Sequence, residues 1–212
     1  MQTDKIKVVS DGTGREEALL QVEKFAEYVG LDRQQELRLR LITEETLGMI
    51  EAIARDFRAD YWIENDEKDT CVVHLKAETM MDTEKKELFM SASTSGKNEA
   101  AKGFMGKIRD LLQNGMNRME DVGKINSEYG GDPFMFAYMG ATNFDGMDMT
   151  APVYSWSLQN YKQIIETEKA KNPQAEEAWD ELEKSIVASI ADDVRVAIVG
   201  SMVELMIEKK FD

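Results

Sequence analysis

The stretch Arg38–Ile53, RLRLITEETLGMIEAI, decides the predicted fold. At about 100° per residue its large apolar residues fall on one broad stripe: Leu39, Ile42, Met49, Ile50 and Ile53. Glu44 and Gly48 share roughly the opposite side, together with Leu37 and Leu41. The pattern predicts a long helix with one face on a core and a second face that carries carboxylates and a glycine.

A strand and a first helix are expected before this stretch. KIKVVS (5–10) is short and β-branched, which favours a strand, and DGTG follows it as a turn. Apolar residues spaced by three and four predict a helix over 15–29 that ends at Gly30. Asp32 and Gln35 form a capping-box pattern, so the second helix begins there and is expected to run to about Phe57.

Two hairpins are expected after the second helix. Strand-like segments at 59–66 and 70–78 flank a short charged turn, and His74 is expected to be half-exposed on the second of them. Near the end of the chain, residues 194–198 and 203–207 alternate around Gly200-Ser201, which is a two-residue turn signal. The sequence therefore predicts one hairpin on each side of a long middle segment.

Three helices are predicted in the middle segment, where residues 79–98 are expected to be mainly a loop and the Gly- and Met-rich residues 114–152 give no firm pattern. Helices are expected over 98–113, 156–170 and 173–190, and residues 133–139 suggest a strand. Strands and helices are segregated rather than strictly alternating, which indicates the α+β class. We expect one domain over 1–212, a two-layer sandwich with helices packed on one face of a mixed, largely antiparallel sheet.

Composition limits the classes of partner. The chain has 212 residues and a formal net charge of -15, which argues against duplex DNA or an anionic membrane as a partner. One cysteine and one histidine exclude an internal disulfide and leave a Cys/His zinc site close to excluded. No apolar stretch approaches the ~18 residues needed to cross a bilayer, and the N-terminus lacks a signal peptide's apolar core. We expect a cytoplasmic protein that binds neither nucleic acid nor membrane.

The layout of the first 80 residues resembles the GHKL ATPase superfamily, which includes histidine kinase catalytic domains and the anti-sigma factor serine kinases. It is most similar to the anti-sigma kinases, with a strand, a helix, a Gly-Leu pair (Gly30 and Leu31), an acidic-centred helix and a hairpin. The resemblance implies a GHKL-like core over 5–112 and 190–212, with an insertion at about 113–189. It also implies a regulatory protein partner and a homodimer.

The first motif of that superfamily is E-x-x-x-N, in which the Glu is a general base and the Asn coordinates Mg²⁺ on the ATP phosphates. The best match here is EETLG, which makes Glu44 the implied catalytic residue and places Gly48 where the Asn is expected. Glycine has no side chain with which to bind a metal. The register that starts at Glu45 places Met49 there, which is no better as a ligand.

Two further motifs concern the nucleotide itself. The adenine-binding D-x-G-x-G box has no counterpart, because Asp82 is the only aspartate in its place and no glycine follows it. The Gly-rich lid resembles SGKNEAAKGFMGKIRDL (95–111). Glycines that open a helix can hold phosphate through backbone N–H groups. The implied ATP- or ADP-binding residues, with Mg²⁺, are therefore Gly48, Lys97, Gly103, Gly106 and Lys107.

These departures from the superfamily favour a GHKL-like regulatory protein that resembles an anti-sigma factor serine kinase, with ATP binding weakened or lost. An active kinase is not expected. The alternative is a non-catalytic protein–protein interaction module, a pseudo-kinase, on the same fold; the 14 methionines suit an adaptable surface. A third hypothesis is an enzyme or binding protein of another class that uses an acidic pocket around Glu44, Glu45 and Glu51.

Overall fold

The computed structural model describes the chain in six stretches: 1–53, 56–65, 70–79, 153–170, 173–199 and 202–211. The predicted helix at 98–113 and the strand suggested at 133–139 lie outside these residues. Everything below concerns the described part of the chain.

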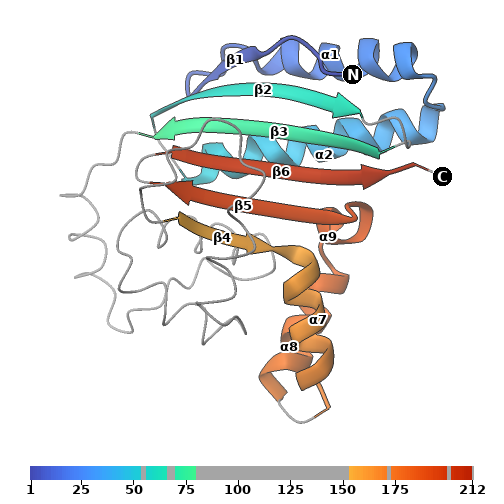
Figure 1. Cartoon of the computed structure of the whole chain (residues 1–212), viewed down its shortest axis with the longest axis vertical. Helices are drawn as coiled ribbons and strands as arrows, with labels where there is room; N and C mark the ends of the chain where they lie inside the picture. Colours follow the sequence, from blue (N-terminus) through green and yellow to red (C-terminus); the bar gives the residue numbers. More distant parts are fainter. Residues whose placement is uncertain (54–55, 66–69, 80–152, 171–172, 200–201, 212) are drawn as a thin grey trace.

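The described strands form one six-stranded sheet. Their order across the sheet is β1 (Ile6–Val9), β2 (Phe57–Asn65), β3 (Thr70–Thr79), β6 (Met202–Lys210), β5 (Asp193–Val199) and β4 (Val153–Ser157) (Figure 1). Every pairing between these strands is antiparallel, where the sequence predicted a mixed, largely antiparallel sheet. Both predicted hairpins, β2–β3 and β5–β6, are confirmed, and they meet at the centre of the sheet.

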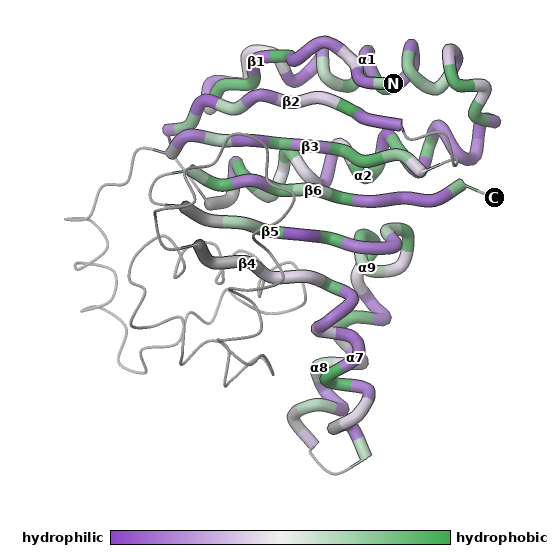
Figure 2. Tube along the Cα trace, viewed as in Figure 1, coloured by the Kyte–Doolittle hydropathy of each residue, from purple (hydrophilic) through white to green (hydrophobic). Residues whose placement is uncertain are grey.

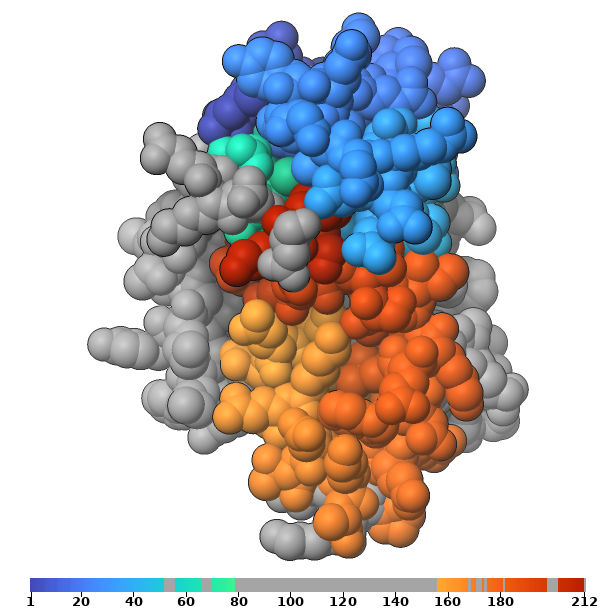
Figure 3. Space-filling model, turned by 90° about the vertical axis from the view of Figure 1, so that its right-hand side faces the viewer, coloured from blue at the N-terminus to red at the C-terminus, as the bar shows by residue number. Residues whose placement is uncertain are grey.

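Helices make up the second layer. α1 (Arg15–Val29) and α2 (Arg33–Ile53) pack against each other and against β1, β2, β3 and β6. α7 (Leu158–Glu168), α8 (Pro173–Glu183) and α9 (Ile186–Ile190) follow β4, and α7 and α8 project beyond the sheet at that edge (Figure 1). Figure 3 shows α1 and α2 in blue toward one end of the molecule and α7 and α8 in orange toward the other, while α9 packs against α2. The α+β class is confirmed, and the arrangement of the helices is compatible with a two-layer sandwich.

The N-terminus of α2 is built as its sequence predicts. The Asp32 backbone N–H donates to Gln35 Oε1 at 2.8 Å, and the Gln35 N–H donates to Asp32 Oδ1 at 2.9 Å. This reciprocal pair satisfies backbone donors that the first helical turn leaves unpaired. The helix ends at Ile53 rather than near Phe57, because Phe57 opens β2 and is buried there.

The core lies between the sheet and the helices. Hydrophobic and hydrophilic residues alternate along α1 and α2 (Figure 2), and the apolar stripe of α2 is buried at Leu39, Ile42, Met49 and Ile50. One polar contact crosses this layer: the hydroxyls of Thr43 on α2 and Tyr61 on β2 lie 2.9 Å apart. Burial raises the pKa of the Tyr61 phenol far above its ordinary value, so this group is a neutral hydrogen-bonding partner.

Residues 153–190 differ from prediction at two boundaries. The segment expected to be a helix over 156–170 contains the end of β4 followed by α7. The Ser157 hydroxyl caps the helix by accepting from the Asn160 N–H, so α7 begins at Leu158. The expected helix over 173–190 is interrupted after Glu183, and the Ser185 hydroxyl caps the start of α9 by accepting from the Ala188 N–H. β4 lies in the segment assigned to an insertion, and it is an edge strand of the same sheet.

Candidate functional site

The implied catalytic residue, Glu44, takes part in an ionic cross-link between the first two helices. Its Oε1 accepts from Arg40 Nε at 3.2 Å, one turn earlier on α2, and Arg40 also contacts the carboxylate of Glu23 on α1. A second link joins Arg15 at the start of α1 to Glu51 on α2 at 2.5 Å. These side chains are about one third or more exposed, so each pair contributes little to stability, about 0–1 kcal/mol. In this arrangement the Glu44 carboxylate is already engaged by a cation.

Gly48 lies one turn after Glu44 on α2 and faces open space. A Cβ atom built on it has no heavy atom within 4 Å among the described residues. No described strand or helix approaches this glycine closely. The Gly48 position, which the resemblance aligns with an Mg²⁺-binding Asn, therefore has room for a side chain.

The remaining implied nucleotide-binding residues lie outside the described part of the chain. They are Lys97, Gly103, Gly106 and Lys107. Their position relative to Glu44 and Gly48 stays a prediction. Among the described residues, no group of three or more His, Cys, Asp or Glu side chains is arranged to hold a metal ion.

The face of the sheet turned away from α2 carries a second cluster, made of Lys5, Trp62, Glu64 and His74. The imidazole of His74 stacks on the Trp62 ring, with centroids 4.6 Å apart and planes 7° apart. Lys5 Nζ lies 4.3 Å from the centroid of the same ring. Glu64 Oε1 accepts from Trp62 Nε1 at 3.0 Å, and its Oε2 lies 3.5 Å from His74 Nε2. We refer to these four residues as the Trp62 cluster.

His74 is 8% exposed, so the expectation of a half-exposed strand residue is wrong. Burial lowers the pKa of its imidazole; the Glu64 carboxylate opposes this shift, and the Lys5 ammonium adds to it. His74 is therefore neutral at pH 7. The sequence contained a signal for this contact, because Trp62 and His74 lie equally far from the centre of the predicted hairpin turn.

An open pocket of about 440 Å³ adjoins the Trp62 cluster. It is lined by Met1, Gln2, Glu64, Asn65, Thr70, Val72 and Glu208. Its two carboxylates repel phosphate groups, so the pocket is unsuited to the phosphate end of a nucleotide. Both carboxylates already have partners, since Glu64 accepts from Trp62 and Glu208 Oε2 accepts from Arg195 at 2.9 Å.

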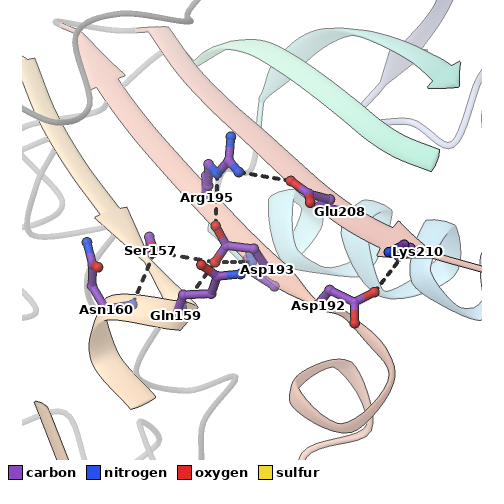
Figure 4. Close-up of polar contacts among 9 residues, drawn as sticks. Ser157, Gln159, Asn160, Asp192, Asp193, Arg195, Glu208 and Lys210 are labelled. Carbon is purple, nitrogen blue, oxygen red and sulfur yellow. Dashed lines mark hydrogen bonds and ion pairs between the residues drawn. The ribbon is translucent and has the colours of Figure 1, made fainter. Parts of the chain in front are cut away.

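Arg195 connects this pocket to a corner of the fold (Figure 4). The buried carboxylate of Asp193 accepts from Arg195 Nε at 2.8 Å, from the Val194 N–H at 2.9 Å and from the Gln159 N–H at 3.1 Å. The Ser157 hydroxyl also donates to it at 3.3 Å. The Asp193 carboxylate is saturated with donors, so it serves the junction of β5, β4 and α7 and is not free to act as a catalytic base.

Comparison with known proteins adds no assignment to this geometry: no family model, curated protein or solved structure matches the chain. No helix within the described residues is both long and apolar enough to cross a membrane. The site therefore has to be interpreted from its own residues.

Proposed function

We propose that this protein is a GHKL-like regulatory protein, similar in layout to the anti-sigma factor serine kinases, in which ATP binding is weakened or lost. The observation that carries this proposal is the state of the α2 motif. Glu44 is paired with Arg40, and Gly48 supplies no ligand where the motif requires an Asn. A carboxylate that is paired with a guanidinium is a weak general base. A magnesium site that lacks its amide ligand does not support phosphoryl transfer well.

The alternative is a non-catalytic protein–protein interaction module on the same fold. It is favoured by three large apolar side chains that remain exposed on α1 and α2: Leu20 at 52%, Tyr28 at 75% and Leu37 at 53%. Single exposed apolar residues are common on protein surfaces. These three residues therefore indicate a candidate contact surface on α1 and α2, and they do not identify the partner.

The test is a thermal melt of the full chain with and without Mg·ATP and Mg·ADP. A ligand at about 100 times its dissociation constant adds about 2.7 kcal/mol to the free energy of unfolding. That is a rise of several degrees, at roughly 2–4 °C per kcal/mol for a chain of this size. We expect a rise well below this for the natural sequence at millimolar nucleotide. A saturable rise of that full size contradicts weakened binding, and it reopens the kinase hypothesis.

The variant Gly48→Asn makes this test informative about the motif. The open space around Gly48 lets an Asn side chain fit. This side chain restores the amide that the superfamily uses to bind Mg²⁺. We expect Gly48→Asn to gain a nucleotide-dependent rise in melting temperature that requires Mg²⁺ and disappears with EDTA. Gly48→Ala is the matched control, since it changes the helix without adding a ligand. No gain in the Asn variant counts against a GHKL-like nucleotide site on α2.

A further inference from the structure

The Trp62 ring is held between two basic groups on the face of the sheet turned away from α2. His74 comes from β3, and Lys5 precedes β1. Because β1 and β3 flank β2 on opposite sides, these two groups reach Trp62 from opposite directions. A proton on His74 therefore places like charges on the two sides of one indole ring.

The imidazole of His74 is poorly satisfied in its neutral form. Neither ring nitrogen has a hydrogen-bond partner within the described part of the chain, and both nitrogens are buried. The Glu64 carboxylate, 3.5 Å from Nε2, is shared with the Trp62 indole N–H. A buried polar group without a partner costs free energy, so this arrangement is sensitive to any change in the charge of the ring.

The N-terminal segment, residues 1–5, lies along the same stretch of β2. The Met1 ammonium donates to Asn65 O at 2.6 Å, and the Asn65 N–H donates to Met1 O at 2.8 Å. The Thr3 N–H donates to Ile63 O at 2.9 Å, and its hydroxyl accepts from the Ile63 N–H at 2.9 Å. These contacts alternate along β2 with the side chains of Trp62 and Glu64, which belong to the Trp62 cluster.

We propose that the Trp62 cluster is an acid-sensitive latch, which holds residues 1–5 on β2 at neutral pH and loosens them when His74 takes up a proton. The proton places a positive charge opposite Lys5 and draws the Glu64 carboxylate toward the imidazole and away from the indole N–H. Both effects weaken the contacts that Lys5 and Glu64 make with Trp62. The proposal stands independently of any nucleotide binding.

The other charged groups on this face of the sheet belong to β2, β3, β5 and β6 and to the segment before β1. Met206 of β6 is its register partner, and Glu204 and Glu208 lie two residues to either side on that strand. On β3 the next residue on the same face is Lys76. Glu64 and Asp60 of β2 are on this face too, and Asp60 is the register partner of Lys76. Arg195 of β5 is the register partner of Met206, and Lys5 lies over the Trp62 ring. The carboxylates favour the protonated ring and the lysines oppose it, but burial is the largest effect and opposes it as well.

The sign of the pH dependence follows from the lowered pKa of His74. An imidazole in the unfolded or locally opened chain takes up a proton below about pH 6.5, whereas the buried one resists until a lower pH. The stability that neutral His74 contributes is therefore fully present above about pH 6.5 and is lost as the pH falls below it. Opening of the latch grows by up to about tenfold for each pH unit in that window.

Two measurements on the full chain test the latch. His74 is the only histidine in the sequence, so its imidazole gives a single NMR titration curve. We expect a midpoint below about 6.5. Hydrogen exchange of the Thr3, Ile63 and Asn65 amides, each divided by its intrinsic rate at that pH, is expected to accelerate as His74 titrates. A midpoint at or above that value, or exchange that does not change across the titration, overturns the proposal.

Variants separate the latch from a general effect of acid. His74→Gln removes the titrating group, so the pH-dependent part of the exchange is expected to disappear. Lys5→Gln removes the like charge, so the His74 midpoint is expected to rise. Lys7→Gln is its matched control, because Lys7 is exposed and pairs with Asp60 at 2.5 Å. Equal acceleration in His74→Gln, or equal midpoints in the two lysine variants, contradicts the latch. If His74→Gln does not fold, the hydrogen exchange of the natural chain and the His74 midpoints of the two lysine variants still test the latch.

Discussion

At the scale of single residues, two glycines differ in whether the fold requires glycine: Gly14 precedes α1, and Gly48 lies within α2. Gly14 has φ of 83°, and a Cβ atom built on it lies 1.9 Å from Lys7 O, so only glycine fits between the start of α1 and β1. Gly48 has helical backbone geometry within α2 and open space around it. The sequence alone does not separate these two cases, because the deciding contact to Lys7 joins parts of the chain that only the fold brings together.

The two glycines give a paired prediction with opposite signs. We expect Gly48→Ala to raise the free energy of unfolding by about 1 kcal/mol, because alanine is the better helix former and nothing obstructs its methyl group. We expect Gly14→Ala to lower it by several kcal/mol, because strain at a positive φ, about 1–3 kcal/mol, adds to a clash with backbone. Urea denaturation of both variants measures the difference. A destabilised Gly48→Ala means that an unseen contact approaches that helix face.

The exposure of the side chains on β3 could be predicted from the sequence only in part. Cys71, Val73, Leu75 and Ala77 alternate along β3, so they share one face, and all four are buried. His74 lies on the other face and was expected to be half-exposed, but it is buried. Alternation assigns a side chain to a face, whereas its exposure depends on what covers that face. The stacking of Trp62 follows only once cross-strand pairing is considered.

At the scale of elements, local patterns predicted most of what is described. The capping box of Asp32 and Gln35, the apolar stripe of α2 and both hairpins are encoded by neighbours in sequence. The boundary between β4 and α7 was missed by two residues, because Trp156 fits the apolar spacing of the helix that follows it. Ser157 was the available signal, since serine is a preferred helix N-cap.

Asp193 gives the prediction at this scale, because its carboxylate joins three elements. We expect Asp193→Ala to lower the free energy of unfolding by on the order of 2–4 kcal/mol, since it leaves buried donors from β5 and α7 without a partner. Asp192→Ala is the matched control one residue earlier. Its carboxylate accepts from the Lys210 N–H at 2.6 Å, but it is 43% exposed, so a cost of about 1 kcal/mol is expected. Equal costs by urea denaturation refute this role for Asp193.

At the scale of the whole molecule, the order of the strands in the sheet could not be predicted from the sequence. Periodicity assigns strands, but the pairing of β3 with β6 joins residues that are far apart in the chain. The candidate site is limited in a similar way. Glu44 and Gly48 were placed on one helix face from their spacing, while the contact of Arg40 with Glu23, which links Glu44 to α1, depends on how α1 packs on α2. Gly103 and Gly106 stay untested, since they lie outside the described residues.

The formal net charge of -15 gives a prediction for the molecule as a whole. Like charges repel one another in the compact state, and salt screens this repulsion over about 10 Å at 0.1 M ionic strength. Salt also weakens exposed pairs such as Lys7–Asp60, but each of these contributes only about 0–1 kcal/mol. We therefore expect the melting temperature to rise as sodium chloride is raised to about 0.3 M, a range in which screening dominates. A fall shows that the ion pairs outweigh the repulsion.

The pairing of β3 with β6 also determines when this protein can fold during synthesis. Val73 and Ile207 are register partners although about 130 residues separate them. A ribosome adding about 5–20 residues per second needs on the order of ten seconds to cover that distance. Throughout that time β1, β2, β3 and both N-terminal helices are complete, yet the edge of β3 that belongs at the centre of the sheet has no neighbour. An uncovered strand edge is a template for pairing with other chains, so this interval is when the nascent protein is most open to mispairing with other chains.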